Sequence, residues 1–129
     1  MLSRPASCRG CPLDSIATGF MAPSLSSLAD RYKVALVGEA LGEQEAEEGS
    51  PFVGKAGFRL TRLIEWAGLD RSKFDIFNVC WCRPPDNKLE GTPYELPAAA
   101  HCRSAHWDYL ISRSRVLVPL GNVATGILT

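Results

Sequence analysis

The order of apolar and polar positions along the chain predicts alternating strands and helices. A continuous apolar run is typical of a strand buried on both faces, whereas apolar residues that recur every three or four positions are typical of a helix. These patterns predict strands at residues 34–37, 74–79 and 116–118, and helices over residues 56–67, from 92 to about 112, and from 121 onward. Strands that alternate with helices predict an α/β fold with a parallel sheet.

Prolines and glycines mark the irregular segments. Residues 1–30 read as an irregular lead-in, and residues 83–93 as a loop. The run Thr92-Pro93-Tyr94-Glu95 has the form of a capping box, although Pro97 would then lie inside the helix and makes a start at 97 the alternative. We expect one domain over residues 1–129, incomplete at its C-terminus, because a helix after the third strand would have little to pack against.

Composition places the chain among ordinary folded proteins. Its 129 residues are 46% hydrophobic and 22% charged, and 14 basic residues balance 14 acidic ones. We expect no membrane partner, because no apolar run is long enough to span a bilayer. The first residues lack the apolar stretch of a secretory signal, so we expect a cytoplasmic location.

Five cysteines are the first chemical feature. Cys8 and Cys11 form a C-x-x-C pair, and Cys80, Cys82 and Cys102 supply further thiols. In a reducing compartment such a set indicates a metal ion or an iron–sulfur cluster rather than disulfides, and the spacing alone does not separate zinc from a cluster. The alternative for Cys80 and Cys102 is a buried small apolar side chain.

Residues 37–57 form the second feature, because they follow the first strand at the edge where α/β proteins bind ligands. This segment offers Glu39, Glu45, Phe52 and several glycines. The alternatives are a solvated loop for the glutamate run and a core position for Phe52. Residues 49–56 nearly match a phosphate-binding loop, but we reject that function because an alanine replaces the magnesium-binding hydroxyl and a proline removes an N–H donor.

Asn78 ends the second predicted strand, and strand alternation would put it on the same face as Cys80 and Cys82. Its amide can donate and accept, so it can read the edge of a base or cap a loop. His101 and His106 fall on a predicted helix, and we interpret both as structural or solvated.

Four segments together resemble the iron–sulfur, or family 4, uracil-DNA glycosylases: CRGCPL, VGEALGEQEAEEGSPFVGKAG, NVCWCRPPDN and VLVPLGNVA. The resemblance extends from Cys8 to the end of the chain. It implies a three-layer α/β fold around an open, mostly parallel sheet. It also implies a structural [4Fe–4S] cluster, with zinc as the alternative, and its N-V-x-x-C spacing selects Cys82 over Cys80. The implied cluster ligands are Cys8, Cys11, Cys82 and Cys102.

The same resemblance implies that a monomer hydrolyses the N-glycosidic bond of uracil in DNA after the base has left the helix stack. It implies that Phe52 stacks on the uracil, that Asn78 binds its pyrimidine edge, and that Gly38 and Asn87 lie at the substrate. Glu39, Ala40 and Glu45 belong to the catalytic loop. One of these carboxylates would orient water or stabilise the sugar cation, and the sequence does not decide which.

The family's C-terminal motif, a His-Pro-Ser-type segment, has no counterpart in these residues, so we expect weak or no activity from this chain alone. The alternative function is a non-catalytic module on the same fold that holds a cluster or a metal and binds nucleic acid.

Overall fold

Three parallel strands form an open sheet at the centre of the computed structural model, which describes residues 4–26 and 32–129. They are β1 (Val34–Gly38), β2 (Asp75–Asn78) and β3 (Val116–Pro119), in the order β2-β1-β3. The register pairs Gly38 with Asn78, so the carboxyl ends of β1 and β2 lie side by side. The predicted strands and the α/β fold are confirmed.

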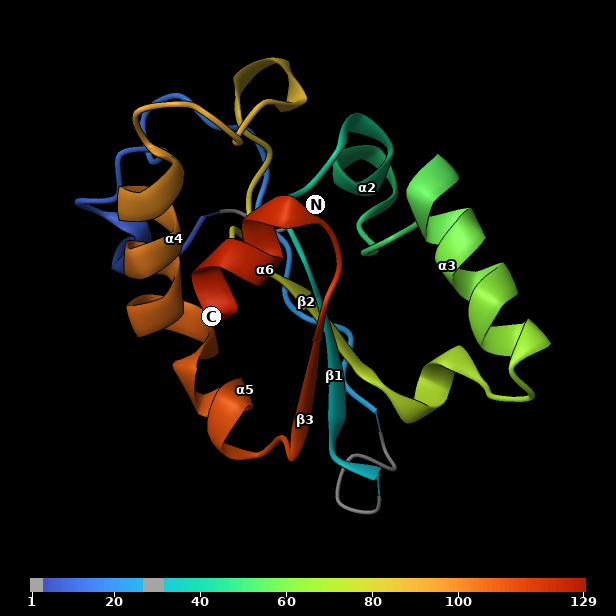
Figure 1. The fold of residues 1–129 in the computed structure, drawn as a ribbon. Helices are drawn as coiled ribbons and strands as arrows, with labels where there is room; N and C mark the ends of the chain where they lie inside the picture. Colours follow the sequence, from blue (N-terminus) through green and yellow to red (C-terminus); the bar gives the residue numbers. More distant parts are fainter. Residues whose placement is uncertain (1–3, 27–31) are drawn as a thin grey trace.

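Helices cover both faces of this sheet (Figure 1), which confirms the three-layer architecture. One side carries α3, and the other carries α4, α5 and α6. The helical elements are η1 (Ala6–Cys8), α2 (Glu43–Glu48), α3 (Lys55–Trp66), η2 (Arg71–Lys73), η3 (Pro85–Asn87), α4 (Glu95–Cys102), the π-helical η4 (Arg103–Trp107), α5 (Asp108–Ser112) and α6 (Asn122–Leu128).

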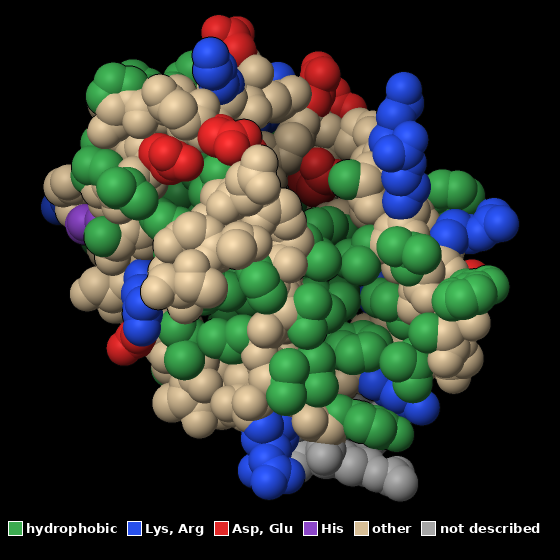
Figure 2. Space-filling model, in the orientation of Figure 1, with side chains coloured by type: hydrophobic (Ala, Val, Ile, Leu, Met, Phe, Trp, Pro, Cys, Tyr) green, Lys and Arg blue, Asp and Glu red, His purple; other side chains and the backbone are tan. Residues whose placement is uncertain are grey.

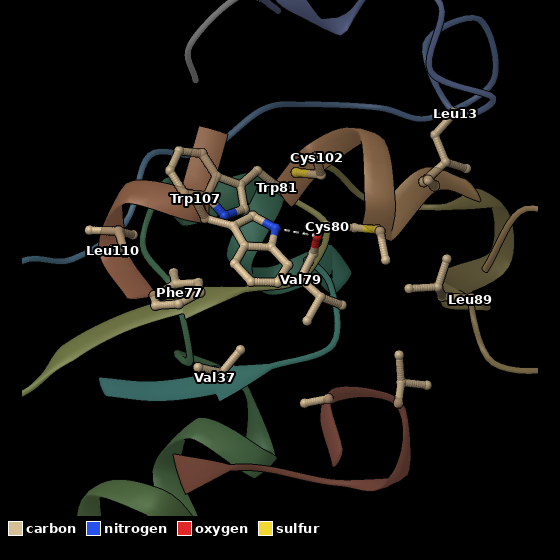
Figure 3. Packing of buried hydrophobic residues seen from close by; sticks show 14 of the residues in the cluster. Leu13, Val37, Phe77, Val79, Cys80, Trp81, Leu89, Cys102, Trp107 and Leu110 are labelled. Atoms are coloured by element: carbon tan, nitrogen blue, oxygen red, sulfur yellow. Dashed lines mark hydrogen bonds between the residues drawn. The ribbon is translucent and has the colours of Figure 1, made fainter. Parts of the chain in front are cut away.

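Two hydrophobic clusters hold the layers together. In the larger one, Phe77 and Val79 pack with Trp107 and Leu110 (Figure 3), and the Trp107 indole N–H donates to the Val79 carbonyl at 2.9 Å. In the smaller one, Ile76 lies with residues of β1 and α3. Because neighbouring residues of β2 enter opposite clusters, the strand is buried on both faces, as its place in a covered parallel sheet requires.

The lead-in is irregular over its described residues, 4–26, as expected. Single antiparallel bridges join Thr18 to Arg83 and Ser24 to Ile76, so this segment runs along the β2 side of the sheet. Residues 1–3 and 27–30 of the predicted lead-in lie outside the described residues.

The start of α4 corrects both sequence predictions. The helix begins at Glu95, neither at 92 nor at 97, and the capping box is absent because the Thr92 hydroxyl donates instead to the Leu89 carbonyl. Pro97 is tolerated in the first turn, where its missing N–H would have had no helical partner. The helical path then continues through the π-helical η4 to Ser112, close to the predicted end.

The glutamate run is another correction, because it forms the short helix α2 rather than a loop. Glu43, Glu47 and Glu48 are nonetheless exposed to solvent, in agreement with the solvated interpretation.

Strand β3 is the less covered edge of the sheet, and Val116 is 51% exposed. Hydrophobic side chains gather on this face of the molecule, over β3 and toward α3 (Figure 2). Across residues 4–26 and 32–129, every helix is too short or too polar to cross a bilayer.

Candidate functional site

A cleft opens where the three strands end, between the α2–α3 segment and the loop after β3. Gly38 and Asn78 supply its floor from β1 and β2, and Gly121 borders it after β3. The cleft brings together all seven residues that the sequence placed at the substrate: Gly38, Glu39, Ala40, Glu45, Phe52, Asn78 and Asn87.

Gly38 allows two of these side chains to meet over the end of β1. A β-carbon at this position would lie 2.3 Å from Phe52 Cζ and 2.5 Å from Asn78 Oδ1, so only glycine fits without displacing them. Asn78 is 5% exposed, and Phe52 lines the cleft while also packing on the smaller cluster. The result is an aromatic ring and an amide side by side, a combination that can stack on a planar base and read its polar edge.

Phe52 is held in an unusual backbone conformation. Its φ of +53° lies in the left-handed region, which costs a residue with a β-carbon about 1–3 kcal/mol and persists only when the surroundings fix it. Arg71 provides one restraint, because its guanidinium donates to the Phe52 carbonyl at 2.7 Å and also to the Pro51 carbonyl. Nothing in the sequence pattern singles out Arg71 for this role, since it lies beyond α3, 19 residues from Phe52.

Glu45 provides the second restraint. Its Oε2 accepts from the N–H groups of Val53 at 3.0 Å and Gly54 at 2.7 Å, while its Oε1 accepts from Gly42 N–H at 3.0 Å. The carboxylate therefore joins the start of α2 to the loop that carries Phe52. It also places a negative charge at the N-terminus of α3, where a bound phosphate would otherwise be favoured.

Glu39 is half-buried in the cleft, as Glu45 is. Burial raises the pKa of Glu39 above its ordinary value, and the negative charges of Glu90 and Glu95 raise it further. Ala40 follows it without adding a polar group. Asn87 has a φ of +57°, and its Oδ1 accepts from Arg83 Nε at 2.6 Å at the rim.

The cysteines surround a second cavity, away from the cleft. Cys8 and Cys11 reach it from the lead-in, Cys82 from the segment after β2, and Cys102 from the end of α4. All are free thiols. Burial raises the pKa of Cys82 to about 12, and the neighbouring thiols Cys11 and Cys8 contribute to the same direction.

Cys80 lines the same cavity but is 1% exposed and belongs to the larger hydrophobic cluster. Asn78, in contrast, lines the cleft at the strand ends, so the prediction that Asn78, Cys80 and Cys82 share one face is wrong. Strand β2 ends at Asn78, and the side-chain alternation of a strand does not continue beyond it.

The residues around the cysteine cavity fit a bound group with sulfur acceptors. Among the described residues, two buried side-chain atoms lack a hydrogen-bond partner, Arg4 Nε and Trp81 Nε1, and both side chains line this cavity. Within the same part of the chain, no group of three or more His, Cys, Asp or Glu side chains is placed to hold a metal ion. The thiols thus border a shared space instead of converging on one point.

Both histidines hold the lead-in, in line with the structural interpretation. His101 Nε2 lies 2.8 Å from the Ser7 carbonyl oxygen, and His106 Nε2 lies 3.3 Å from Cys8 Sγ. Sequence reasoning missed the polar lining formed by Arg4, Trp81 and His106, because these residues share no spacing or motif.

Comparison with known proteins gives a consistent result. The family model described as the uracil DNA glycosylase superfamily matches residues 25–129. The chain is 38% identical over 121 residues to the type-4 uracil-DNA glycosylase of Thermotoga maritima, covering 94% of this chain and 60% of that protein. It is 37% identical over 123 residues to the type-4 enzyme of Archaeoglobus fulgidus, covering 92% and 56%, respectively. The chain thus spans less than two thirds of the length of these relatives.

Proposed function

Because this chain belongs to the uracil DNA glycosylase superfamily, we propose that its cleft binds a uracil extruded from DNA and that the protein hydrolyses the uracil's N-glycosidic bond. The observation that carries this proposal is the placement of the Phe52 ring beside the Asn78 amide, over Gly38, where the strands end. The relatives from Thermotoga maritima and Archaeoglobus fulgidus are type-4 uracil-DNA glycosylases, which supports the same reaction.

In this proposal the base enters the cleft and stacks on Phe52. Extrusion costs a few kcal/mol, which the ring offsets by covering one face of the base. Asn78 binds the pyrimidine edge, with its NH2 group donating to O4 of uracil and its Oδ1 accepting from N3–H. Held in that orientation, the amide opposes cytosine, whose donor and acceptor are reversed. Asn87, at the rim, lies where the flanking strand would pass.

The two candidate carboxylates have different roles in this reading. Three backbone N–H groups occupy Glu45, so we assign it to holding the loop in place. Glu39 lines the cleft, and its raised pKa reflects a partly dry environment where an ionised carboxylate acts strongly on a nearby positive charge. We therefore assign to Glu39 the orientation of the attacking water or the stabilisation of the cationic sugar.

For the second cavity we propose a [4Fe–4S] cluster bound by Cys8, Cys11, Cys82 and Cys102. These four thiols line one cavity, and four cysteines can bind either a zinc ion or a [4Fe–4S] cluster; the resemblance to the iron–sulfur glycosylases favours the cluster. Such a cluster would fasten the lead-in to the segment after β2 and to α4. Cys80 and Cys102 both belong to the larger cluster, so burial does not separate ligand from core residue, and we assign Cys82 rather than Cys80 from the N-V-x-x-C spacing.

Uracil release tests the reaction. The substrates are single-stranded and duplex oligonucleotides with one uracil, and matched oligonucleotides with thymine serve as controls. Two proteins are compared, this chain and this chain joined to the remaining length of the Thermotoga maritima relative. We expect release only from the uracil-containing oligonucleotides, weak or absent with this chain by itself and clearly measurable with the joined protein. If the joined protein folds, binds DNA and leaves uracil in place, the glycosylase proposal fails and the non-catalytic nucleic-acid module is favoured.

A further inference from the structure

The cysteine cavity has two donors without an acceptor among residues 4–26 and 32–129. They are the indole N–H of Trp81, a side chain that is 6% exposed, and the buried Nε of Arg4. A buried donor without a partner is destabilising, and native structures rarely leave one. Two such donors in one cavity therefore indicate that the cavity binds a group with hydrogen-bond acceptors.

We infer that Trp81 Nε1 and Arg4 Nε donate hydrogen bonds to sulfur atoms of the group held by the cysteines, and that these bonds set its reduction potential. This inference rests on the cluster in the proposed function. Indole and guanidinium groups donate and never accept, so a thiolate or sulfide that accepts from them is the complementary partner.

Both side chains are fixed by other contacts within the protein, which leave Trp81 Nε1 and Arg4 Nε unused. The Trp81 ring stacks on His106 with centroids 5.3 Å apart at 18°, and Phe20 packs against it at 6.0 Å. The other guanidinium nitrogens of Arg4 donate to the Leu13 and Ala17 carbonyls at 3.2 and 2.5 Å. Because the surroundings already hold these side chains, their free N–H groups are pre-positioned, as expected of groups that orient and tune a metal site.

The direction of the effect follows from charge. A hydrogen bond to sulfur stabilises the more negative, reduced form, so removing it shifts the potential to more negative values. The positive charge of Arg4 likewise stabilises the reduced form.

Trp81→Phe is the test variant, because it keeps an aromatic ring against His106 and removes the N–H together with the five-membered part of the indole. Trp107→Phe is the matched control, because it removes an indole N–H that donates to the Val79 carbonyl in the core. Trp107 does not line the cysteine cavity. Arg4→Lys is the second variant, which keeps the charge and removes Nε. The proteins are purified without oxygen, and redox titration is followed by visible absorption, with Fe–S stretching frequencies measured by resonance Raman spectroscopy.

We expect Trp81→Phe and Arg4→Lys each to change the reduced-to-oxidised ratio about tenfold at a fixed potential, equivalent to about 59 mV for one electron. Their Fe–S stretching frequencies should shift, while those of Trp107→Phe stay at the wild-type values. If a cluster is present and both variants match Trp107→Phe in potential and stretching frequencies, this inference is overturned while the proposed function stands. If the purified protein holds no cluster, the cluster proposal and this inference fail together, whereas the uracil-release test is unaffected.

Discussion

Glu45→Ala should destabilise the protein far more than the position of Glu45 on a short surface helix suggests. The substitution removes the acceptor of three backbone N–H groups, those of Gly42, Val53 and Gly54. Water reaches part of this region, so each bond contributes about 1 kcal/mol rather than the upper value for a charged acceptor. The sum is about 3 kcal/mol, which for a domain of this size corresponds to a melting temperature lower by about 12 °C.

The control is Glu48→Ala, on the same helix but exposed, which should cost less than about 0.5 kcal/mol. Thermal unfolding followed by near-ultraviolet circular dichroism gives both values. The structural role of Glu45 is refuted if the two alanine variants melt within 3 °C of each other. Glu45→Gln distinguishes a structural role from a catalytic one, because it keeps one acceptor oxygen. Loss of uracil release at a nearly wild-type melting temperature would show that Glu45 is catalytic.

Three other measurements address the sites. Asn78→Ala should lower the preference for uracil over cytosine in DNA by about 10- to 100-fold, which is the contribution of one base contact with two hydrogen bonds. Asn87→Ala should change this preference little, and base release measures both variants. Glu39 has a pKa raised above 4.5 by burial, so the folded protein binds its proton more tightly and loses stability as the pH rises through that raised value. Glu39→Gln should therefore melt higher than wild type at pH 8 and equally at pH 4, with uracil release lowered throughout; equal melting at pH 8 would contradict the burial argument. Cys82→Ser should lose iron and Cys80→Ser retain it, and the reverse iron contents would exchange the two ligand assignments.

The strands and the cleft could be predicted because they follow from short-range patterns and one topological rule. The apolar run of β1 and the alternation of β2 are visible locally, and the ends of parallel strands must meet at one edge. That rule alone gathers Glu39, Phe52 and Asn78 from segments far apart in sequence. The prediction that Asn78, Cys80 and Cys82 share one face failed because β2 ends at Asn78, before the end of the apolar pattern. Alternation does not predict the path of the chain after the strand ends.

Helix α2 and the start of α4 could not be predicted for a different reason. Both depend on which partner a polar side chain chooses. Thr92 has the spacing of a capping residue, but its hydroxyl donates to the nearby Leu89 carbonyl instead. The glutamates of α2 have no apolar periodicity, and the helix is fixed by a carboxylate that reaches back to the N–H of Gly42.

The roles proposed for Glu39 and Glu45 also depend on which hydrogen-bond partners each carboxylate has. The two residues lie six positions apart in one acidic segment, and sequence reasoning treats them as equivalent. Their difference arises from their surroundings. The N–H groups of Val53 and Gly54 donate to the Glu45 carboxylate and occupy it. Glu39 lies in the cleft, where burial and the nearby charges of Glu90 and Glu95 raise its pKa. A saturated carboxylate is held in one position and is poorly placed to move a proton. A carboxylate that is costly to ionise attracts a cation strongly, and for this reason we propose that Glu39, rather than Glu45, acts on the sugar.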